Sequence, residues 1–207
     1  MIIQVDPEYP LRKDIKYAVN ILSRGGVIAY PTDTIYGIGC DLMNKDAIEK
    51  IYRIKKLPKY KQLSFICYDI KQVSEYAQVS NAVYKIMKQL TPGPFTFILN
   101  ASKSVPKIMM NKRREVGIRI ADNAICSALI EELGNPIINT SASFDKDEDD
   151  EEEYVCNPEH IHDKFGNNLD LVIDGGLAYF DPSTIIDMTK DYPEIIRQGK
   201  GDASSIL

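Results

Sequence analysis

Helical and strand-like patterns alternate along the chain, and this alternation constrains the fold more than any other feature of the sequence. Apolar residues recur every three or four positions in four stretches, which predicts helices around residues 15–22, 48–52, 83–90 and 125–133. Short runs rich in β-branched and aromatic residues predict strands at 27–30, 63–67, 95–99, 116–120, 136–139, 169–173, 184–187 and 194–197. This order predicts an α/β fold with helices flanking a sheet.

The last 40 residues are rich in predicted strands, so we expect some antiparallel pairing and a mixed parallel and antiparallel sheet. Gly25 and Gly26 are expected to end the first helix, and residues 91–94 (Thr-Pro-Gly-Pro) to turn the chain into the next strand. Neither segment is typical of an interdomain linker. A length of 207 residues fits one globular domain, and we expect residues 1–207 to form it.

Charge is distributed unevenly in this chain of net charge −5. The segment 145–153 (DKDEDDEEE) carries eight acids and one lysine, so the remaining residues sum to a small positive charge and an anionic ligand is not excluded. We expect this run to be solvated surface, and the alternative is a flap over a site. No apolar run reaches the roughly 18 residues of a membrane span, and the first residues do not resemble a signal peptide, so we expect a cytoplasmic protein without a membrane segment.

Several common catalytic arrangements are missing from the sequence. There is no P-loop motif, and Gly37-Ile38-Gly39 lacks the third glycine of a dinucleotide-binding loop. The only two histidines, His160 and His162, are poor material for a catalytic triad. The four cysteines are too far apart for a zinc or redox motif and are predicted to be buried free thiols, and we expect no metal site in the protein itself.

Polar residues that follow predicted strands supply the candidate site. After the strand 27–30, residues 31–39 (PTDTIYGIG) form a predicted loop whose hydroxyls, carboxylate and glycines can approach a small ligand. Arg119 ends another predicted strand and is expected to face a ligand without a required partner in the core. Further hydroxyls and cations come from residues 55–61, 139–143, 183–184 and 197–199. Together these segments predict a pocket for an anionic small molecule.

The motifs PTDTIYGIG, LTPGPFTFIL, VGIRI, NTSAS, DGG, STIID and IIRQG, with a lysine 21 residues after Thr34, resemble the YrdC-like family of threonylcarbamoyl-AMP synthases over nearly the whole chain. The segment RIKKLPKYKQLSFIC is most similar to the YciO branch. The resemblance implies a twisted mixed sheet around a large, concave, positively charged cavity. It also implies an association with ATP, L-threonine and double-stranded RNA.

The resemblance implies a nucleotidyltransferase reaction. L-Threonine, bicarbonate and ATP, with Mg²⁺ accompanying the ATP, yield threonylcarbamoyl-AMP and pyrophosphate for N6-threonylcarbamoyladenosine formation in tRNA. Because N-carboxythreonine attacks the α-phosphate, catalysis consists of positioning and of neutralising the triphosphate. The implied catalytic residues are Lys55 and Arg119. Those implied for threonine are Thr34, Arg119, Ser183 and Asn139, and those for the nucleotide are Lys55, Lys61, Ser141 and Arg197.

The sequence departs from the family pattern near the predicted phosphate site. Leu57 stands where the synthases carry the arginine of a K-x-R motif, and Ser143 replaces the asparagine of Ser-Ala-Asn. The neighbouring lysines can supply positive charge, but an ammonium group cannot bind a phosphate through two parallel hydrogen bonds as a guanidinium does. Three hypotheses therefore follow: a slow synthase, a non-catalytic binder of double-stranded RNA or a nucleotide, and a hydrolase of an adenylate or another modified nucleotide.

Overall fold

The computed structural model describes residues 1–58, 61–144, 153–179, 181–190 and 192–206. Ten strands form one sheet in the order β1-β10-β2-β3-β7-β4-β6-β5-β11-β12. They are β1 (Ile2–Gln4), β2 (Ile28–Tyr30), β3 (Gly37–Gly39), β4 (Ser64–Ile66), β5 (Phe95–Asn100), β6 (Glu115–Arg119), β7 (Ile137–Ser141), β10 (Leu171–Asp174), β11 (Thr184–Asp187) and β12 (Glu194–Arg197). A separate pair joins β8 (Ser143–Phe144) to β9 (Glu153–Tyr154).

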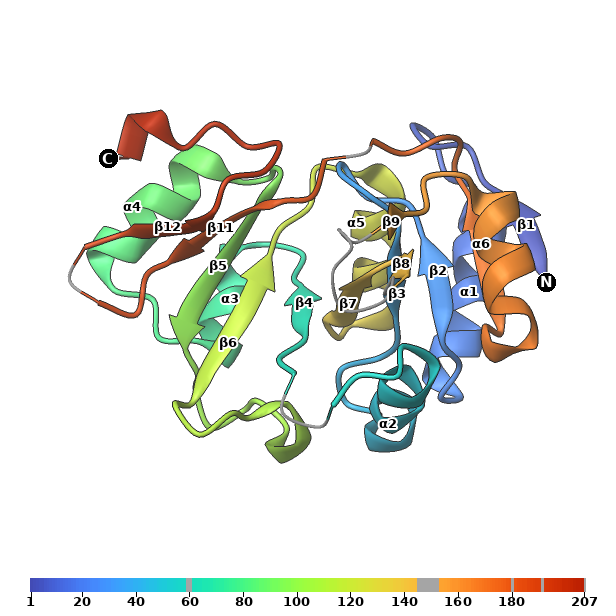
Figure 1. Cartoon of the computed structure of the whole chain (residues 1–207), viewed down its shortest axis with the longest axis horizontal. Helices are drawn as coiled ribbons and strands as arrows, with labels where there is room; N and C mark the ends of the chain where they lie inside the picture. Colours follow the sequence, from blue (N-terminus) through green and yellow to red (C-terminus); the bar gives the residue numbers. More distant parts are fainter. Residues whose placement is uncertain (59–60, 145–152, 180, 191, 207) are drawn as a thin grey trace.

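The main sheet mixes both strand directions, which confirms the predicted fold class. Parallel pairs are β1 with β10, β10 with β2, β4 with β6, and β5 with β11. Antiparallel pairs are β2 with β3, β3 with β7, β4 with β7, β5 with β6, and β11 with β12. The last pair is the antiparallel pairing expected near the end of the chain. Figure 1 shows the two termini beside opposite edges of the sheet.

Six α-helices flank the sheet in the described part of the chain: α1 (Arg12–Ser23), α2 (Lys45–Ile54), α3 (Ile70–Tyr76), α4 (Asn81–Leu90), α5 (Ala124–Leu133) and α6 (Pro158–Phe165). Three short 3₁₀ helices are η1 (Lys107–Met109), η2 (Gly166–Asn168) and η3 (Ser204–Ile206). Five of the α-helices begin with a side chain that accepts a backbone N–H of the first turn, from Asn44, Asp69, Ser80, Asn123 and Asn157. The sequence prediction missed α3, α6, β1, β3, β8 and β9.

Apolar side chains fill both faces of the sheet. Along β2, Ile28 and Tyr30 belong to a cluster with α1 and α5, whereas Ala29 between them belongs to the larger cluster with α2, α3, α4 and α6. This alternation follows from the two-residue period of a strand, and burial on both faces explains why the strand sequences are almost continuously apolar. Figure 1 shows α3 and α4 beside one half of the sheet and α1 and α5 beside the other.

Residues 37–39, which were predicted to belong to a ligand-contacting loop, are instead the strand β3 inside the sheet. The glycines are needed there because the neighbouring strand lies very close. A Cβ on Gly39 would collide with the carbonyl oxygen of Ile138, and one on Gly37 would collide with the Asn139 side chain. Packing against β7 therefore accounts for both glycines, and the polar part of the motif is restricted to residues 32–36.

The structure also bears on the predictions made for the cysteines, for membrane segments and for the acidic run. The four cysteines are buried free thiols, as predicted. The longest helix among the described residues, α1, has 12 residues. No helix of the described residues is long and apolar enough to cross a membrane. Among the described residues no group of three or more His, Cys, Asp or Glu side chains could hold a metal ion. Residues 145–152 of the acidic run lie outside the described residues.

Candidate functional site

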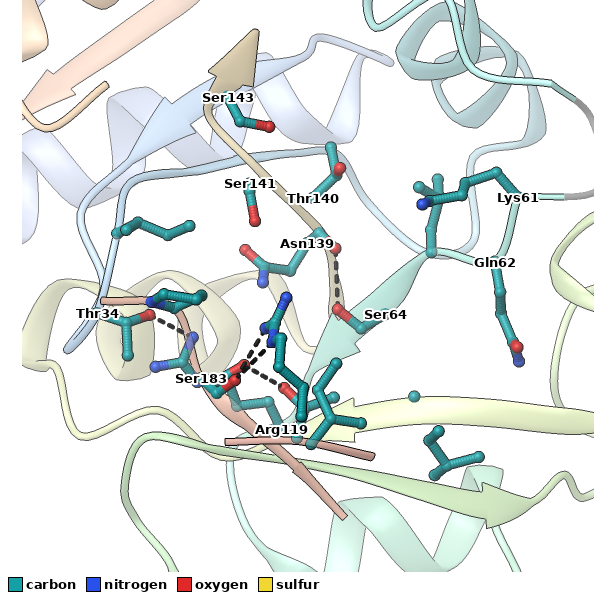
Figure 2. Close-up of a pocket in the computed structure, with 18 of the residues that line it drawn as sticks. Thr34, Lys61, Gln62, Ser64, Arg119, Asn139, Thr140, Ser141, Ser143 and Ser183 are labelled. Carbon is teal, nitrogen blue, oxygen red and sulfur yellow. Dashed lines mark hydrogen bonds between the residues drawn. The ribbon is translucent and has the colours of Figure 1, made fainter. Parts of the chain in front are cut away.

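All eight residues predicted for the site line one pocket of about 300 Å³ over the central strands (Figure 2). They are Thr34, Lys55, Lys61, Arg119, Asn139, Ser141, Ser183 and Arg197. These residues come from β6, β7 and β12, from the end of α2 and from three connecting segments, so only the folded chain brings them together. Gly117 of β6 also lines the pocket, where the absence of a side chain leaves room above the sheet.

Arg119 is the last residue of β6, as predicted, but it has an acidic partner in the core. Its guanidinium forms an ion pair with Asp33 and donates a hydrogen bond of 2.8 Å to Thr34 Oγ1. The two charged side chains are 3% and 10% exposed. The expectation that Arg119 needs no partner was wrong, because a guanidinium buried this deeply requires a counter-charge. Its Nε is buried and finds no acceptor within the described chain, so a donor is left for a ligand.

The loop that carries Thr34 and Asp33 is fixed from several sides. Thr32 Oγ1 donates to the carbonyl of Ile35 at 2.7 Å, accepts from the backbone N–H of Thr34, and lies 3.1 Å from Thr34 Oγ1. Lys200 donates to the carbonyl of Asp33 at 2.7 Å, which ties the C-terminal segment to the loop. Thr34 is therefore presented to the pocket by a preorganised turn.

Lys55 follows the last residue of α2 and is buried despite its charge. Its ammonium donates to the carbonyl oxygen of Ser143 and lies 3.2 Å from Ser143 Oγ. It also lies 5.9 Å from the centre of the Phe165 ring. The helix end and β8 thus hold this cation at the pocket wall.

Ser183 and Arg197 are joined at another wall. Arg197 Nη2 donates 2.8 Å to the carbonyl oxygen of Ser183, whose hydroxyl lies 2.8 Å from Thr96 Oγ1 of β5. No carboxylate of the described chain lies within 4.0 Å of the Arg197 guanidinium. Arg197 is consequently positioned by a backbone carbonyl while its charge stays available to an anion.

The strand β7 contributes the remaining polar wall. Figure 2 shows Asn139 and Ser141 pointing into the pocket from this strand. Asn139 Oδ1 accepts a hydrogen bond of 3.1 Å from the hydroxyl of Tyr30, a buried phenol whose pKa is raised by desolvation. The hydroxyl therefore remains a neutral donor, and Asn139 is oriented with its amide nitrogen free of that bond.

In the loop after α2, some residues line the pocket and others are exposed to solvent. Lys61 and Leu57 line the pocket, and Leu57 also packs against the apolar core. Lys56 is exposed and does not line it, while Lys59 lies outside the described residues. Leucine at position 57 thus presents an apolar surface at the pocket wall, where the family motif carries an arginine.

The residues predicted individually for the site leave out Asp33 and Ser143, although both lie in segments that were expected to border it, and Gln62, Ser64 and Thr96 lie outside all of those segments. Ser64, Thr96 and Ser143 line the pocket, and Asp33 supports it through Arg119. Ser143 could have been found from the spacing, because residues 139, 141 and 143 share one side of an extended segment. Asp33 and Thr96 carry no such signal, since their partners Arg119 and Ser183 are more than 80 residues away in sequence.

The pocket walls carry four cations and no carboxylate among the described residues, together with hydroxyls and an amide. Asp33 offsets the charge of Arg119, and the pocket walls also carry the cations Lys55, Lys61 and Arg197, which attract an anion. This arrangement defines an α/β protein whose site is suited to a small molecule with negative and hydroxyl groups.

The family model for Sua5, YciO and YrdC proteins, described as "Telomere recombination", matches residues 20–199, and the chain belongs to this family. It is 39% identical over 204 residues to the uncharacterized protein YciO of Escherichia coli, covering 98% of this chain and 97% of that protein. The crystal structure of E. coli YciO superimposes with a TM-score of 0.92 and covers 100% of this chain and 99% of that one.

Proteins of the synthase type are also similar. A threonylcarbamoyl-AMP synthase of Vibrio vulnificus is 28% identical over 191 residues, which cover 90% of this chain and 98% of that protein. The structure of P. abyssi Sua5 complexed with L-threonine is 27% identical and has a TM-score of 0.88, covering 96% of this chain and 57% of that one. These comparisons confirm the predicted family and the mixed sheet with flanking helices.

Proposed function

We propose that this protein is a threonylcarbamoyl-AMP synthase-like enzyme that binds ATP and L-threonine in the pocket described above. The observation that carries the proposal is the convergence of all eight residues implied by the synthase motifs on the walls of one pocket. Its lining suits an anionic nucleotide, and the L-threonine complex of P. abyssi Sua5 supplies a relative that binds this amino acid.

The proposed reaction begins when L-threonine and bicarbonate form N-carboxythreonine and release water. A carboxylate oxygen of this carbamate attacks the α-phosphorus of ATP. The bond from that phosphorus to the bridging oxygen of the β-phosphate breaks, and the electron pair leaves with pyrophosphate. No covalent bond to the protein is needed, so the pocket contributes orientation and charge stabilisation.

The proposed roles follow the position of each side chain. Thr34 and Ser183, which both line the pocket, hold threonine, and the buried guanidinium of Arg119 offers its unpaired Nε to the carboxylate. Asn139 lines the amino-acid side. Lys55, Lys61, Ser141 and Arg197 face the nucleotide, where their cations offset the charge that develops on the leaving pyrophosphate. Because the described lining has no carboxylate, Mg²⁺ would enter bound to the ATP phosphates as part of the substrate.

A direct assay tests the proposal. The protein is incubated with L-threonine, bicarbonate and Mg-ATP, and pyrophosphate and threonylcarbamoyl-AMP are quantified by mass spectrometry. We expect both products only when all three substrates are present. Lys55→Gln should lower their formation, whereas Lys56→Gln removes the same charge at an exposed neighbour outside the pocket and should have little effect. Equal product with and without threonine would exclude synthase activity.

A second candidate function is binding of a nucleotide or double-stranded RNA without turnover. Leu57 favours it, because an apolar side chain replaces the phosphate-binding arginine of the synthase motif. Titration of ATP and L-threonine, separately and together, discriminates between the two functions. Cooperative binding of both ligands supports a synthase site, and ATP or RNA binding that threonine does not alter supports the second candidate.

A further inference from the structure

A second groove of about 450 Å³ adjoins the pocket, and Lys61 and Gln62 line both of them. We call it the side groove and define its polar walls by Lys61, Gln62, Asn111, Lys112, Arg113 and Glu115. Figure 2 shows the side chains of Lys61 and Gln62 diverging from the shared wall. The segment that carries Lys61 and Gln62 is therefore a wall shared by the pocket and the side groove, and Lys61 lines both.

Hydrogen bonds hold this shared wall in place. Gln62 Nε2 donates to the carbonyl oxygen of Glu115, and Asn111 Nδ2 donates to Gln62 Oε1 at 3.1 Å. Asn111 Oδ1 in turn accepts the backbone N–H of Glu115 at 3.0 Å. On the other side, the Tyr52 hydroxyl donates to the carbonyl of Lys61 at 2.8 Å. The side groove therefore has preorganised walls, which reduces the entropic cost of binding a ligand.

Positive charge dominates the side groove. Lys61, Lys112 and Arg113 line it, and within the described chain no carboxylate lies within 4.0 Å of their charged groups. Glu115 is the one lining carboxylate, and its Oε2 lies 3.4 Å from the Asn111 amide nitrogen. Residues 101–114 contain five lysines and arginines and no acid, although the whole chain has a net charge of −5. Three cations gathered around a single lining carboxylate, with none of them paired to it, favour a polyanionic ligand.

Backbone conformation marks both loops that border the wall. Lys56 has φ 50° and Arg114 has φ 58°, and they are the two non-glycine residues with positive φ in the described chain. A side-chain-bearing residue in this region is strained, and such strain is concentrated at ligand-binding segments. One of these turns precedes Lys61 in the loop after α2, and the other directly follows Arg113.

We propose that the side groove is a phosphate-binding subsite that receives pyrophosphate as it leaves the main pocket. The choice of pyrophosphate rests on the proposed function, whereas the preference for a phosphate anion rests on the charges and geometry of the groove itself. Lys61 contacts the departing group from the main pocket, and Lys112 and Arg113 receive it on the far side of the wall.

The test measures binding of inorganic pyrophosphate to the whole protein by isothermal titration calorimetry, with no ATP, threonine or bicarbonate present. The double variant Lys112→Ala/Arg113→Ala should raise the dissociation constant by about tenfold or more, because it removes two charge-assisted contacts. The matched control Lys103→Ala/Lys107→Ala removes the same charge from exposed residues of the same segment outside the groove, and should change it by less than about twofold.

An equal effect of the two double variants, or no effect of either, would overturn the proposal. A short RNA duplex forms a separate arm of the experiment. If Lys112→Ala/Arg113→Ala weakens RNA binding and leaves pyrophosphate binding unchanged, the groove takes phosphodiesters and the pyrophosphate assignment is wrong. Because binding is measured without the synthase substrates, lack of turnover contradicts only the proposed function, and an unchanged pyrophosphate affinity contradicts only the side groove.

Discussion

Arg119 and Asp33 form a buried ion pair at the pocket wall, 86 residues apart in sequence, and Arg119 also donates to Thr34. Each charge is compensated by the other in a region with little water, so removing one leaves the other buried alone. One oxygen of the Asp33 carboxylate, Oδ2, is buried and has no hydrogen-bond partner within the described residues. Position 119 thus contributes to the fold as well as to the pocket.

Arg119→Ala should lower the free energy of unfolding by about 3–5 kcal/mol, the usual cost of breaking a buried ion pair. Urea denaturation of Arg119→Ala, Asp33→Ala and the double variant measures this as a double-mutant cycle. The double variant should lose less stability than the sum of the single variants, because no uncompensated charge remains. Additive losses would mean that the two side chains do not stabilise one another.

Leu57→Arg should tighten ATP binding by about 1–3 kcal/mol, since it adds a guanidinium to the pocket wall that can donate charge-assisted hydrogen bonds to phosphate. Calorimetry compares ATP binding by Leu57→Arg and Leu57→Lys. A gain specific to arginine would indicate that the guanidinium geometry matters, and equal gains would indicate an effect of charge alone. Leu11→Arg makes the same change at an exposed leucine that does not line the pocket, and should leave ATP affinity unchanged. No gain from either substitution at position 57 in folded protein would indicate a use other than triphosphate chemistry.

Gly39→Ala should destabilise the protein by about 3 kcal/mol, because the new Cβ collides with the Ile138 carbonyl of the adjacent strand. Gly134→Ala is the comparison, since its Cβ would meet nothing within 4 Å and its φ of +77° alone costs about 1–2 kcal/mol. Thermal or urea unfolding ranks the two variants. A smaller loss at Gly39 than at Gly134 would contradict the close approach of β3 and β7.

Alkaline pH should destabilise the protein because three thiols are buried. Desolvation raises the pKa of Cys40, Cys67 and Cys126 above the ordinary value of 9.0. Above pH 9 the unfolded chain therefore loses protons that the folded protein keeps, and the free energy of unfolding falls as pH rises. Each thiol contributes about 1.4 kcal/mol per pH unit in this window, and the stabilisation is fully retained below it.

Urea unfolding between pH 8 and pH 10.5 measures this slope. Cys67→Ala should make this dependence of the free energy of unfolding on pH less steep, because one buried thiol no longer contributes to it. This holds even if the substitution lowers stability at pH 8. A slope that stays the same in Cys67→Ala would show that this thiol ionises no later in the folded protein than in the unfolded one.

Local sequence patterns determined most of the secondary structure. The four periodic stretches form α1, α2, α4 and α5, and each of the eight apolar runs overlaps a strand of the main sheet. These elements are readable because burial of a face imposes a period on nearby residues. The motifs also determined the family and the eight residues that line the pocket.

Tertiary structure decided the features that depend on distant neighbours. Gly37 and Gly39 have the composition of a loop, yet they form β3 because β2 and β7 pair with it on both sides. The helices α3 and α6 are only seven and eight residues long, too short for a clear period.

The same limit applies within the site. The sequence placed Arg119 at a strand end, but its ion pair with Asp33 depends on how the loop after β2 meets the end of β6. The shared wall of the pocket and side groove likewise depends on Gln62 meeting Asn111 and Glu115. Periodicity reports what each segment buries, whereas a contact across the sheet requires the relative placement of segments that only the folded chain defines.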